Sequence, residues 1–329
     1  MPLVPSAAMT VATVGPVGAL ALPVVVLLCW LPYRSRALTL AREGRPVPSW
    51  RRACYAAGLL VLALALSPPV DTLSDQLLVA HMAEHLLIGD VAALLIVLGF
   101  TGPLLAPLLR TRFVGRLRVL SHPLVAVPLW AGNFYAWHLP VLYQAALRHA
   151  ALHALEHATF FGLGMAVWMG LLGPLPKPQW FTNGARLVYI IAVRLIGTVL
   201  ANAMIFSGAA WYPYYRTGDA HWHISVLADQ IAAAGVMMVE ESLLTIGLFC
   251  WLFLKVAREG EERQELLDFA ASRGVELDER RAARAVAAGR AEELRERVLS
   301  TAGATSVGAA GATPVAATPV GASARSARS

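Results

Sequence analysis

The chain has 329 residues, of which 57% are hydrophobic and 15% charged, whereas soluble globular proteins carry roughly 25% charged residues. Almost half of the charged residues lie in 255–299, so the first 254 residues are too poor in charge to coat a water-soluble surface. This composition excludes an ordinary soluble protein. The net charge of +6 does not indicate nucleic-acid binding, because most Lys and Arg residues of the apolar part lie in short gaps between hydrophobic runs.

Seven hydrophobic runs are long enough to cross a bilayer, which takes about 20 apolar residues in a helix. The first run has no Arg or Lys before Arg34 and so lacks the charged start of a cleavable signal peptide. We therefore expect it to be retained as a span. The sequence predicts an all-α integral membrane bundle of seven helices over residues 1–254, with spans near 11–32, 53–70, 76–100, 122–147, 150–173, 187–211 and 223–254.

The positive charges of the loops predict how the bundle is oriented. Arg and Lys gather in three loops, at 34–52, 110–118 and 177–186, whereas the alternate loops hold only Arg148 and Arg216. Cytoplasmic loops are the ones that carry an excess of Lys and Arg. We therefore expect the amino end outside and the carboxyl end in the cytoplasm.

The carboxyl-terminal part differs in composition from the spans. Residues 255–299 mix acidic and basic side chains with few large apolar ones, which predicts a charged cytoplasmic helical extension. Residues 300–329 consist mainly of Ala, Gly, Thr, Ser, Pro and Val. Such a segment buries too little apolar surface to offset ordering, so we expect it to be disordered.

Nine histidines are present, and the predicted topology places all but His122 in the outer loops or the outer halves of spans. Residues four apart share one face of a helix, so a pair with this spacing offers two imidazoles to one point. Polar groups inside a bilayer mark functional sites by default. The pairs with this spacing are His81 with His85, His149 with His153, and His153 with His157.

The histidine set predicts a shared metal site in the outer leaflet, since the His-x-x-x-His spacing also serves helical zinc sites. For any single histidine the alternative is a buried imidazole bonded to a backbone carbonyl. Asp90 is not expected to join, because an α-helix turns it about 140° away from His85. The candidate ligands are His81, His85, His138, His153 and His157, with Asp229 as a possible further ligand.

Two glutamates each precede the second histidine of a pair. We expect Glu84 and Glu156 to accept hydrogen bonds from metal-bound imidazoles and so orient them. They could instead be ligands themselves, or partners of Arg148. The outer histidines that lie in or beside loops are expected to form an access route for the metal: His149, His221 and His223.

Imidazole suits copper, zinc, iron and nickel alike. Met82 is adjacent to His81, and a thioether donor would favour Cu(I), although methionines in apolar helices usually only pack. The three cysteines all lie at predicted cytoplasmic helix ends, which excludes a mixed Cys/His zinc site. Copper is therefore the expected metal.

A separate set of charges lies deeper in the predicted membrane. Arg194 of the sixth span and Glu240 or Glu241 of the seventh fall at comparable depths. An unpaired charge at this depth would be costly, so the sequence predicts an interhelical ion pair. We expect this pair to be structural, with a proton relay as the alternative.

Three segments carry a family resemblance. They are the run HMAEH at 81–85, the run WHLPVLY at 137–143 continuing to LHALEH at 152–157, and Asp229-Gln230 followed by Ala234-Gly235 and Met237. Together they resemble the polytopic CtaG-type cytochrome c oxidase assembly factors over about residues 55–255. The resemblance implies a multi-pass protein of the bacterial plasma membrane. It also implies oxidase subunits as partners and copper delivery or handling on the outer face.

The leading hypothesis is thus a non-catalytic membrane factor that holds copper for cytochrome c oxidase. A seven-span zinc hydrolase is a second possibility, because three histidines with an open coordination position can activate water. That reading calls for a serine beside the cluster, and none lies near His81 or His157 in the sequence. A third possibility is a b-type cytochrome in which histidines of different helices hold haem.

Overall fold

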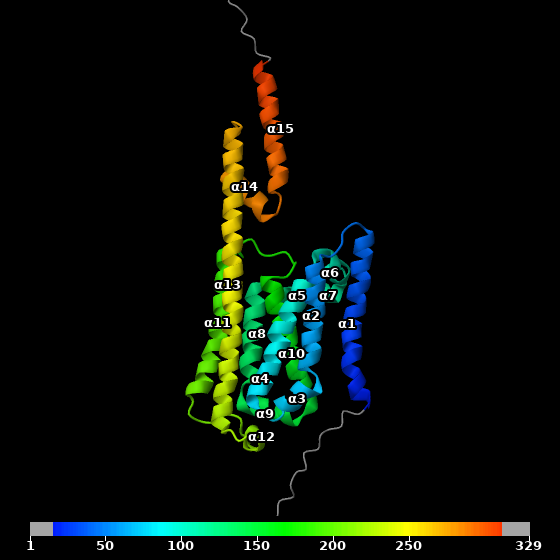
Figure 1. The fold of residues 1–329 in the computed structure, drawn as a ribbon, viewed down its shortest axis with the longest axis vertical. Helices are drawn as coiled ribbons and strands as arrows, with labels where there is room; N and C mark the ends of the chain where they lie inside the picture. Colours follow the sequence, from blue (N-terminus) through cyan, green and yellow to red (C-terminus); the bar gives the residue numbers. More distant parts are fainter. Residues whose placement is uncertain (1–15, 311–329) are drawn as a thin grey trace, which may run out of the picture. The chain divides into compact units, whose positions relative to one another are not determined.

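The computed structural model describes residues 16–310, which form helices and connecting loops without a β-strand in that range. Figure 1 shows the helices in chain order. The chain divides into two compact units, Met1–Phe249 and Cys250–Ser329. The all-helical prediction is therefore confirmed for the described part of the chain.

Two long helices open the first unit. α1 (Pro16–Arg42) is followed by α2 (Ser49–Ala65), and the rings of Tyr33 and Tyr55 stack between them with centroids 3.8 Å apart. α3 (Pro68–Ser74) continues from α2 with a bend of 51°. The prolines at its first two positions cause the bend, since proline lacks an N–H and disfavours helical backbone in the residue before it.

The next span consists of three helical segments in direct succession. α4 (Leu78–Leu86) runs into a π-helix, η1 (Leu87–Ala92), and then into α5 (Ala93–Gly99). A π-helix closes i→i+5 hydrogen bonds, so residues five apart across it lie nearly above one another. Asp90 is therefore turned back toward His85, and both side chains line one small cavity. Asp90 was not expected to join the metal ligands, and it is absent from the group of donor atoms that converge between α4 and the later helix carrying His153.

The fourth predicted span is interrupted. α8 (Pro123–Trp137) ends three residues before Pro140, and the separate helix α9 (Pro140–Arg148) follows. Pro140 forces an extended backbone on Leu139, which a continuous helix cannot contain. His138 consequently caps the carboxyl end of α8. Three short elements precede α8, namely α6 (Gly102–Leu109), α7 (Arg112–Leu117) and the 3-10 turn η2 (Arg118–Ser121).

α10 (Ala150–Leu171) is the central helix of the first unit and packs along α8, α5 and the π-helix. Gly164 makes the last contact possible, since a Cβ atom at this position would lie 2.0 Å from the carbonyl oxygen of Gly89. The backbones of α10 and η1 therefore touch. This close approach sets the distance between the histidine-bearing turns of α4 and α10.

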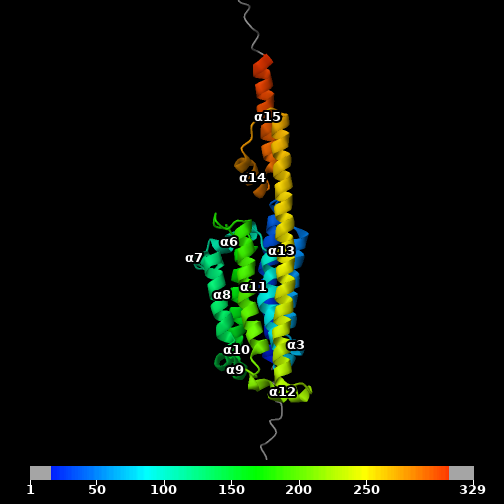
Figure 2. The ribbon, with the colours of Figure 1, turned by 90° about the vertical axis from the view of Figure 1, so that its left-hand side faces the viewer.

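Two further long helices complete the first unit. α11 (Asn183–Phe206) and the first part of α13 (Val226–Ser272) lie side by side in both Figure 1 and Figure 2. The connection between them contains the 3-10 turn η3 (Pro213–Tyr215) and the short helix α12 (Arg216–His221). This connection carries several of the aromatic side chains that reach the histidines.

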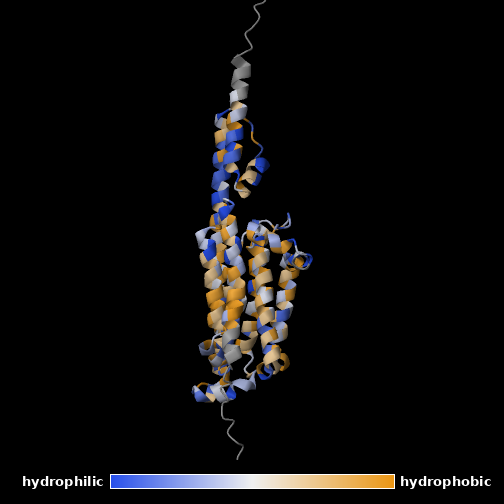
Figure 3. Cartoon of the chain, turned by 90° about the vertical axis from the view of Figure 1, so that its right-hand side faces the viewer, coloured by the Kyte–Doolittle hydropathy of each residue, from blue (hydrophilic) through white to orange (hydrophobic). Residues whose placement is uncertain are grey.

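The helices fit a membrane protein. Four are long and apolar enough to cross a bilayer, or up to five if the bent pair α2 and α3 forms one span. Apolar residues cover the long helices of the first unit in Figure 3, whereas polar residues dominate the helices that follow residue 255. α8 is short because Pro140 ends it, and α10 carries Glu156 and His157 among its apolar residues. The four unbent helices are Leu22–Arg42, Leu78–Gly99, Asn183–Phe206 and Val226–Ser272.

The second unit contains the end of α13 with α14 (Glu279–Ala287) and α15 (Ala291–Ala310). Leu266, Ala282 and Leu294 form its small apolar core. α15 includes residues 300–310, where the low-complexity tail was expected to begin, and residues 311–329 of that tail lie outside the described residues.

Candidate metal centre

Two helices present the same five-residue pattern to each other. α4 carries His81, Glu84 and His85, and α10 carries the same His-x-x-Glu-His spacing at 153–157. One helical turn separates the histidines of each pair, so both imidazoles of a pair face the partner helix. The ring centroids are 4.3 Å apart for His81 and His85. The interface of α4 and α10 is thus lined by ionisable side chains rather than by packing residues.

Four of these side chains converge on one point. His81, His85, His153 and Glu156 each offer a ligand atom, and the four atoms all lie within 4.8 Å of one another. His153 is half-buried, whereas the other three are buried. Zn–N bonds are about 2.0–2.1 Å long, so the four ligands of a tetrahedral ion lie about 3.4 Å from one another. Closing the cluster around an ion requires each donor atom to move by less than an ångström, and the residues fit a metal.

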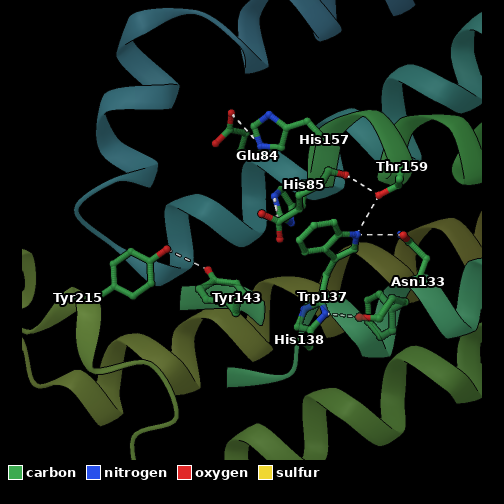
Figure 4. A network of polar contacts seen from close by, with 11 residues as sticks. Glu84, His85, Asn133, Trp137, His138, Tyr143, His157, Thr159 and Tyr215 are labelled. Carbon is green, nitrogen blue, oxygen red and sulfur yellow. Dashed lines mark hydrogen bonds and ion pairs between the residues drawn. The ribbon is translucent and has the colours of Figure 1, made fainter. Parts of the chain in front are cut away.

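The two glutamates cross over to the opposite helix. Nε2 of His85 lies 3.9 Å from Oε1 of Glu156, and Nε2 of His157 lies 3.8 Å from Oε1 of Glu84. Figure 4 shows Glu84 beside His157, with His85 close to them. Glu84 is 0% exposed and Glu156 1% exposed. Glu156 therefore belongs to the cluster as a possible ligand, and Glu84 faces His157 beside it.

The donor atoms of the cluster are buried without hydrogen-bond partners among the described residues. This holds for both ring nitrogens of His81 and His85, for Nε2 of His153 and His157, and for both carboxylate oxygens of Glu156. Leaving a buried polar group unpaired costs about 1–3 kcal/mol. Coordination of a cation would satisfy one ring nitrogen each of His81, His85 and His153 together with a carboxylate oxygen of Glu156.

His138 lies next to the cluster but outside the four-atom group. Its Nδ1 is 2.7 Å from the carbonyl oxygen of Phe134, and its Nε2 has no partner in the described part of the chain. His138 and His85 line a cavity of about 30 Å³ together with two buried methionines, Met82 and Met237. Imidazole and thioether donors thus meet in one small cavity at the cluster.

Three buried tyrosines cover the cluster, and the sequence reasoning missed them. The hydroxyls of Tyr143 and Tyr215 lie 2.9 Å apart, and Tyr212 donates to the carbonyl oxygen of His138 at 2.7 Å. The ring of Tyr143 lies 5.2 Å from that of His81. These tyrosines lie in α9 and in the connection between α11 and α12. They share no helix with the histidines, so the spacing of residues along one helix could not relate them. The aromatic run Tyr212-Pro213-Tyr214-Tyr215 was the available signal.

Asp229 stands apart from the four donors. Its two carboxylate oxygens accept hydrogen bonds from the backbone N–H groups of Leu78 at 2.6 Å and Val79 at 3.0 Å. It therefore satisfies the first turn of α4, where the helix dipole also favours a negative charge. Asp219 of α12 is 1% exposed, and its burial beside Asp229 raises the pKa of Asp219 to about 7.

The outer-loop histidines proposed for access are all exposed and lie outside the cluster: His149, His221 and His223. Acidic side chains lie nearer to it. Asp71 of α3 and Asp75 beyond its end both act electrostatically on His153, the half-buried member of the four candidate ligands. Ser74 of the same helix is 0% exposed and lies next to the Glu84 carboxyl group. The bend at the start of α3 brings this serine to a cluster from which the sequence separates it.

The deeper charges form a second group. Arg194 of α11 donates to a carboxylate oxygen of Glu241 and, at 2.8 Å, to the hydroxyl of Ser242. Glu240 makes no hydrogen bond with its buried oxygens in the described chain. The guanidinium of Arg194 thus joins α11 to α13 through an ion pair with Glu241, whereas Glu240 takes no part in this pair.

The sequence model of the cytochrome c oxidase caa3 assembly factor family (Caa3_CtaG) matches residues 27–259. An uncharacterized protein of Mycobacterium bovis is 23% identical over 244 residues, which cover 69% of this chain and 37% of that protein. One of Mycobacterium leprae is 24% identical over 237 residues, covering 66% of this chain and 36% of its own. The chain thus spans little more than a third of the length of these relatives. No solved structure matches it significantly.

The match includes both His-x-x-Glu-His patterns, the interrupted fourth span and the helix that carries Asp229. It extends over most of the chain, and the three segments that suggested the resemblance all lie inside it. The chain belongs to the cytochrome c oxidase caa3 assembly factor family.

Proposed function

We propose that the protein holds copper at His81, His85, His153 and Glu156 and passes it to a cytochrome c oxidase subunit during assembly, without catalysing a reaction. The observation that carries this proposal is the convergence of four ligand atoms within 4.8 Å on two facing helices of an oxidase assembly factor. Their lack of hydrogen-bond partners in the described chain supports it, because a structural polar network would satisfy them internally.

The surroundings of the cluster favour copper over zinc. Met82 and Met237 are 2% and 1% exposed and line the cavity that His85 and His138 also line. Thioether sulfur is a soft donor that selects Cu(I), whereas zinc sites use imidazole, thiolate and carboxylate. An ion leaving the four-donor group thus has further imidazole and thioether donors beside it. Such an arrangement suits a site that must release its metal.

The proposal includes seven membrane crossings with the cluster on the outer side of the plasma membrane. The crossings are α1, α2 with α3, the span from α4 to α5, α8, α10, α11 and the first part of α13. In Figure 1 the elements α3, α9 and α12 lie at one end of the first unit, and α6 and α7 lie at the other. The arginine-rich loop at 110–118 belongs to the second end. The excess of positive charge places that end in the cytoplasm.

The cation would reach the cluster from the side of α3. His153 is the ligand that solvent reaches, and Asp71 and Asp75 place negative charge near it. Clefts lined by charge of one sign raise the local concentration of opposite ions. In this proposal the acidic end of α3 attracts the cation, and the exposed histidines contribute less.

Metal analysis tests the proposal. Protein purified from cells grown with copper should hold roughly one copper ion per chain, and a His81→Ala/His85→Ala variant should hold almost none. Oxidase activity in the same membranes should fall with it. His122→Asn is the control. His122 lies away from the cluster, and asparagine can retain its N-capping role. Wild-type protein without copper would contradict the proposal.

A zinc hydrolase is the second candidate, and Ser74 is the observation that favours it. This buried serine lies beside Glu84, next to the cluster, and a hydrolase would need a serine near the metal. Stoichiometric zinc together with hydrolytic turnover would support the enzyme. Haem binding between His85 and His138 is not favoured, since their cavity measures about 30 Å³, whereas ligand pockets span roughly 300–1,000 Å³.

A further inference from the structure

Three carboxylates and one guanidinium face each other in the interior of the first unit. Asp90 of η1, Glu240 and Glu241 of α13, and Arg194 of α11 line a single cavity of about 50 Å³. The charges of Asp90, Glu241 and Arg194 all act on Glu240. Arg194 balances one carboxylate through its pair with Glu241. Two carboxylates thus remain without a matching cation among the described residues of this cavity.

This cavity adjoins a second cavity at the histidine cluster, because the two share lining residues. The cavity of about 30 Å³ at the cluster is lined by His85 and His138, and also by Asp90 and Glu241. Both cavities include Trp130. A cavity holds a water molecule once it exceeds roughly 10–15 Å³. Each is therefore large enough for a water molecule, and the two cavities adjoin at Asp90, Trp130 and Glu241.

Buried polar groups line these cavities. Trp168 is 5% exposed, and its indole N–H lies beside the carboxyl group of Asp90. His85 is 6% exposed, and both its ring nitrogens are unpaired in the described chain. Gly197 supplies the room for the carboxylate on the other side, since a Cβ atom there would lie 1.6 Å from Oε1 of Glu241. The site is thus shaped around the carboxylates and retains unfilled hydrogen-bonding capacity.

We propose that Asp90, Glu240 and Glu241 form a proton-binding site that releases a proton when a monovalent cation occupies the histidine cluster. Ionised carboxylates without partners are costly in a membrane, so the site holds protons while the cluster is empty. When the cation arrives, one carboxylic O–H bond breaks. Its electron pair stays on the carboxylate, and the proton leaves through the water-sized cavities to the aqueous phase. The interior charge is unchanged, and nothing is oxidised or reduced.

The charged and titratable groups that face the site are few. α11 contributes Arg194 and Tyr189, and the cluster side contributes His85 and His138. α8 and α10 contribute the non-titratable Trp130 and Trp168. Arg194 holds Glu241 by an ion pair. The releasable proton therefore resides on Asp90 or Glu240.

Proton release during copper binding tests this inference, which rests on the proposed copper site. Cu(I) in acetonitrile is added without oxygen to the full-length protein in weakly buffered detergent solution, and an indicator dye counts the protons. Wild type should release about one proton per bound ion. An Asp90→Asn/Glu240→Gln variant should release at most half as many while binding the same amount of copper. If the double variant is not monodisperse on gel filtration, the single variant Glu240→Gln replaces it in the same measurement, with the same expected decrease in proton release.

Glu261→Gln is the matched control, because Glu261 is an exposed glutamate outside both cavities. It should release as many protons as wild type. Equal release from the double variant and wild type would overturn the inference, since the protons would then come from the cluster itself. Wild type that binds no copper would overturn the proposed function instead, so the two failures are distinguishable.

Discussion

Buried imidazoles with no hydrogen-bond partner distinguish this molecule at the level of single residues. His81 is 0% exposed, and neither ring nitrogen has a partner in the described part of the chain. A fold that gained nothing from such a residue would be more stable with an apolar side chain in its place. The imidazole of His81 therefore serves the proposed metal binding and does not stabilise the fold.

Replacing His81 by leucine separates these two contributions. His81→Leu should stabilise the metal-free protein by about 1 kcal/mol, because it removes an unsatisfied buried group. Thermal unfolding with a chelator present measures this change, and metal analysis should show that copper is lost. His149→Leu, at an exposed position, should alter neither quantity. A lower unfolding temperature for His81→Leu would mean that the imidazole stabilises the empty fold.

Unlike the unpaired His81, Arg194 stabilises the fold, because it neutralises the carboxylate of Glu241. Arg194→Leu leaves Glu241 without its cation, and breaking a buried ion pair costs about 3–5 kcal/mol. The yield of folded protein should fall, while the surviving molecules should still bind metal. Gel filtration and metal analysis measure the two effects, with the exposed Arg42→Leu as control. An unchanged yield together with lost metal would contradict a structural role for the pair.

The raised pKa of Asp219 predicts that the stability of the folded protein depends on pH. Burial beside Asp229 raises the pKa of Asp219 to about 7 in the folded protein, whereas that of an unfolded aspartate is about 3.9. The folded state therefore binds this proton more tightly, and the contribution to stability is lost as pH rises through about 7. Unfolding temperature should decline between pH 5 and pH 8 in wild type. In Asp219→Asn that decline should be smaller, and an identical decline would argue against this group.

At the scale of elements, the π-helix and the contact of α10 with it determine what the histidines face. η1 begins two residues after His85 and turns Asp90 toward the same cavity. π-helical segments within α-helices are frequent at functional sites. The contact of Gly164 with the carbonyl group of Gly89 then fixes how closely the two His-x-x-Glu-His patterns approach.

Alanine at Gly164 should disturb the cluster without touching any ligand. The added Cβ would lie 2.0 Å from the carbonyl oxygen of Gly89, so α10 must move away from η1. Overpacking of this kind costs about 1–3 kcal/mol, and copper content should fall with the unfolding temperature. Gly162→Ala is the matched control on the same helix, because nothing lies within 4 Å of its added Cβ. Equal copper content in both variants would show that this contact does not position the donors.

At the scale of the whole molecule, the charge asymmetry of the loops and the position of the cluster agree. The loop at 110–118 is rich in arginine, and the cluster lies toward the other end of the first unit, near α3 and α9. Because positive loops remain in the cytoplasm, the proposed topology puts the cluster on the outer side of the membrane. The proposed delivery of copper to an oxidase from outside requires this orientation.

Cysteine labelling tests the orientation directly. In a variant whose native cysteines are replaced by serine, Arg148→Cys should react with a membrane-impermeant maleimide in intact spheroplasts. Arg45→Cys should react only after the membrane is opened. Both positions are exposed, so accessibility reports the side of the membrane and not burial. Labelling of Arg45→Cys in intact spheroplasts would reverse the orientation.

The sequence by itself determined the all-helical membrane class and the shared His-x-x-Glu-His pattern of α4 and α10. Hydrophobic runs and the four-residue spacing of histidines are local properties, so they are readable without knowledge of packing. The same spacing brought His81, His85 and His153 forward as candidates. The family followed from the motifs at 81–85, 137–157 and 229–237.

Only the tertiary structure decided which donors share one point and which side chains surround them. Asp229 reaches the start of α4 across 151 positions of the chain, and Tyr212 and Tyr215 approach the histidines from a loop. The orientation of α4 toward α10 depends on the π-helix η1 and on the contact of Gly164 with Gly89. Neither feature appears as a periodic pattern in the sequence. Local spacing shows which residues share a helix face, but long-range packing decides what that face meets.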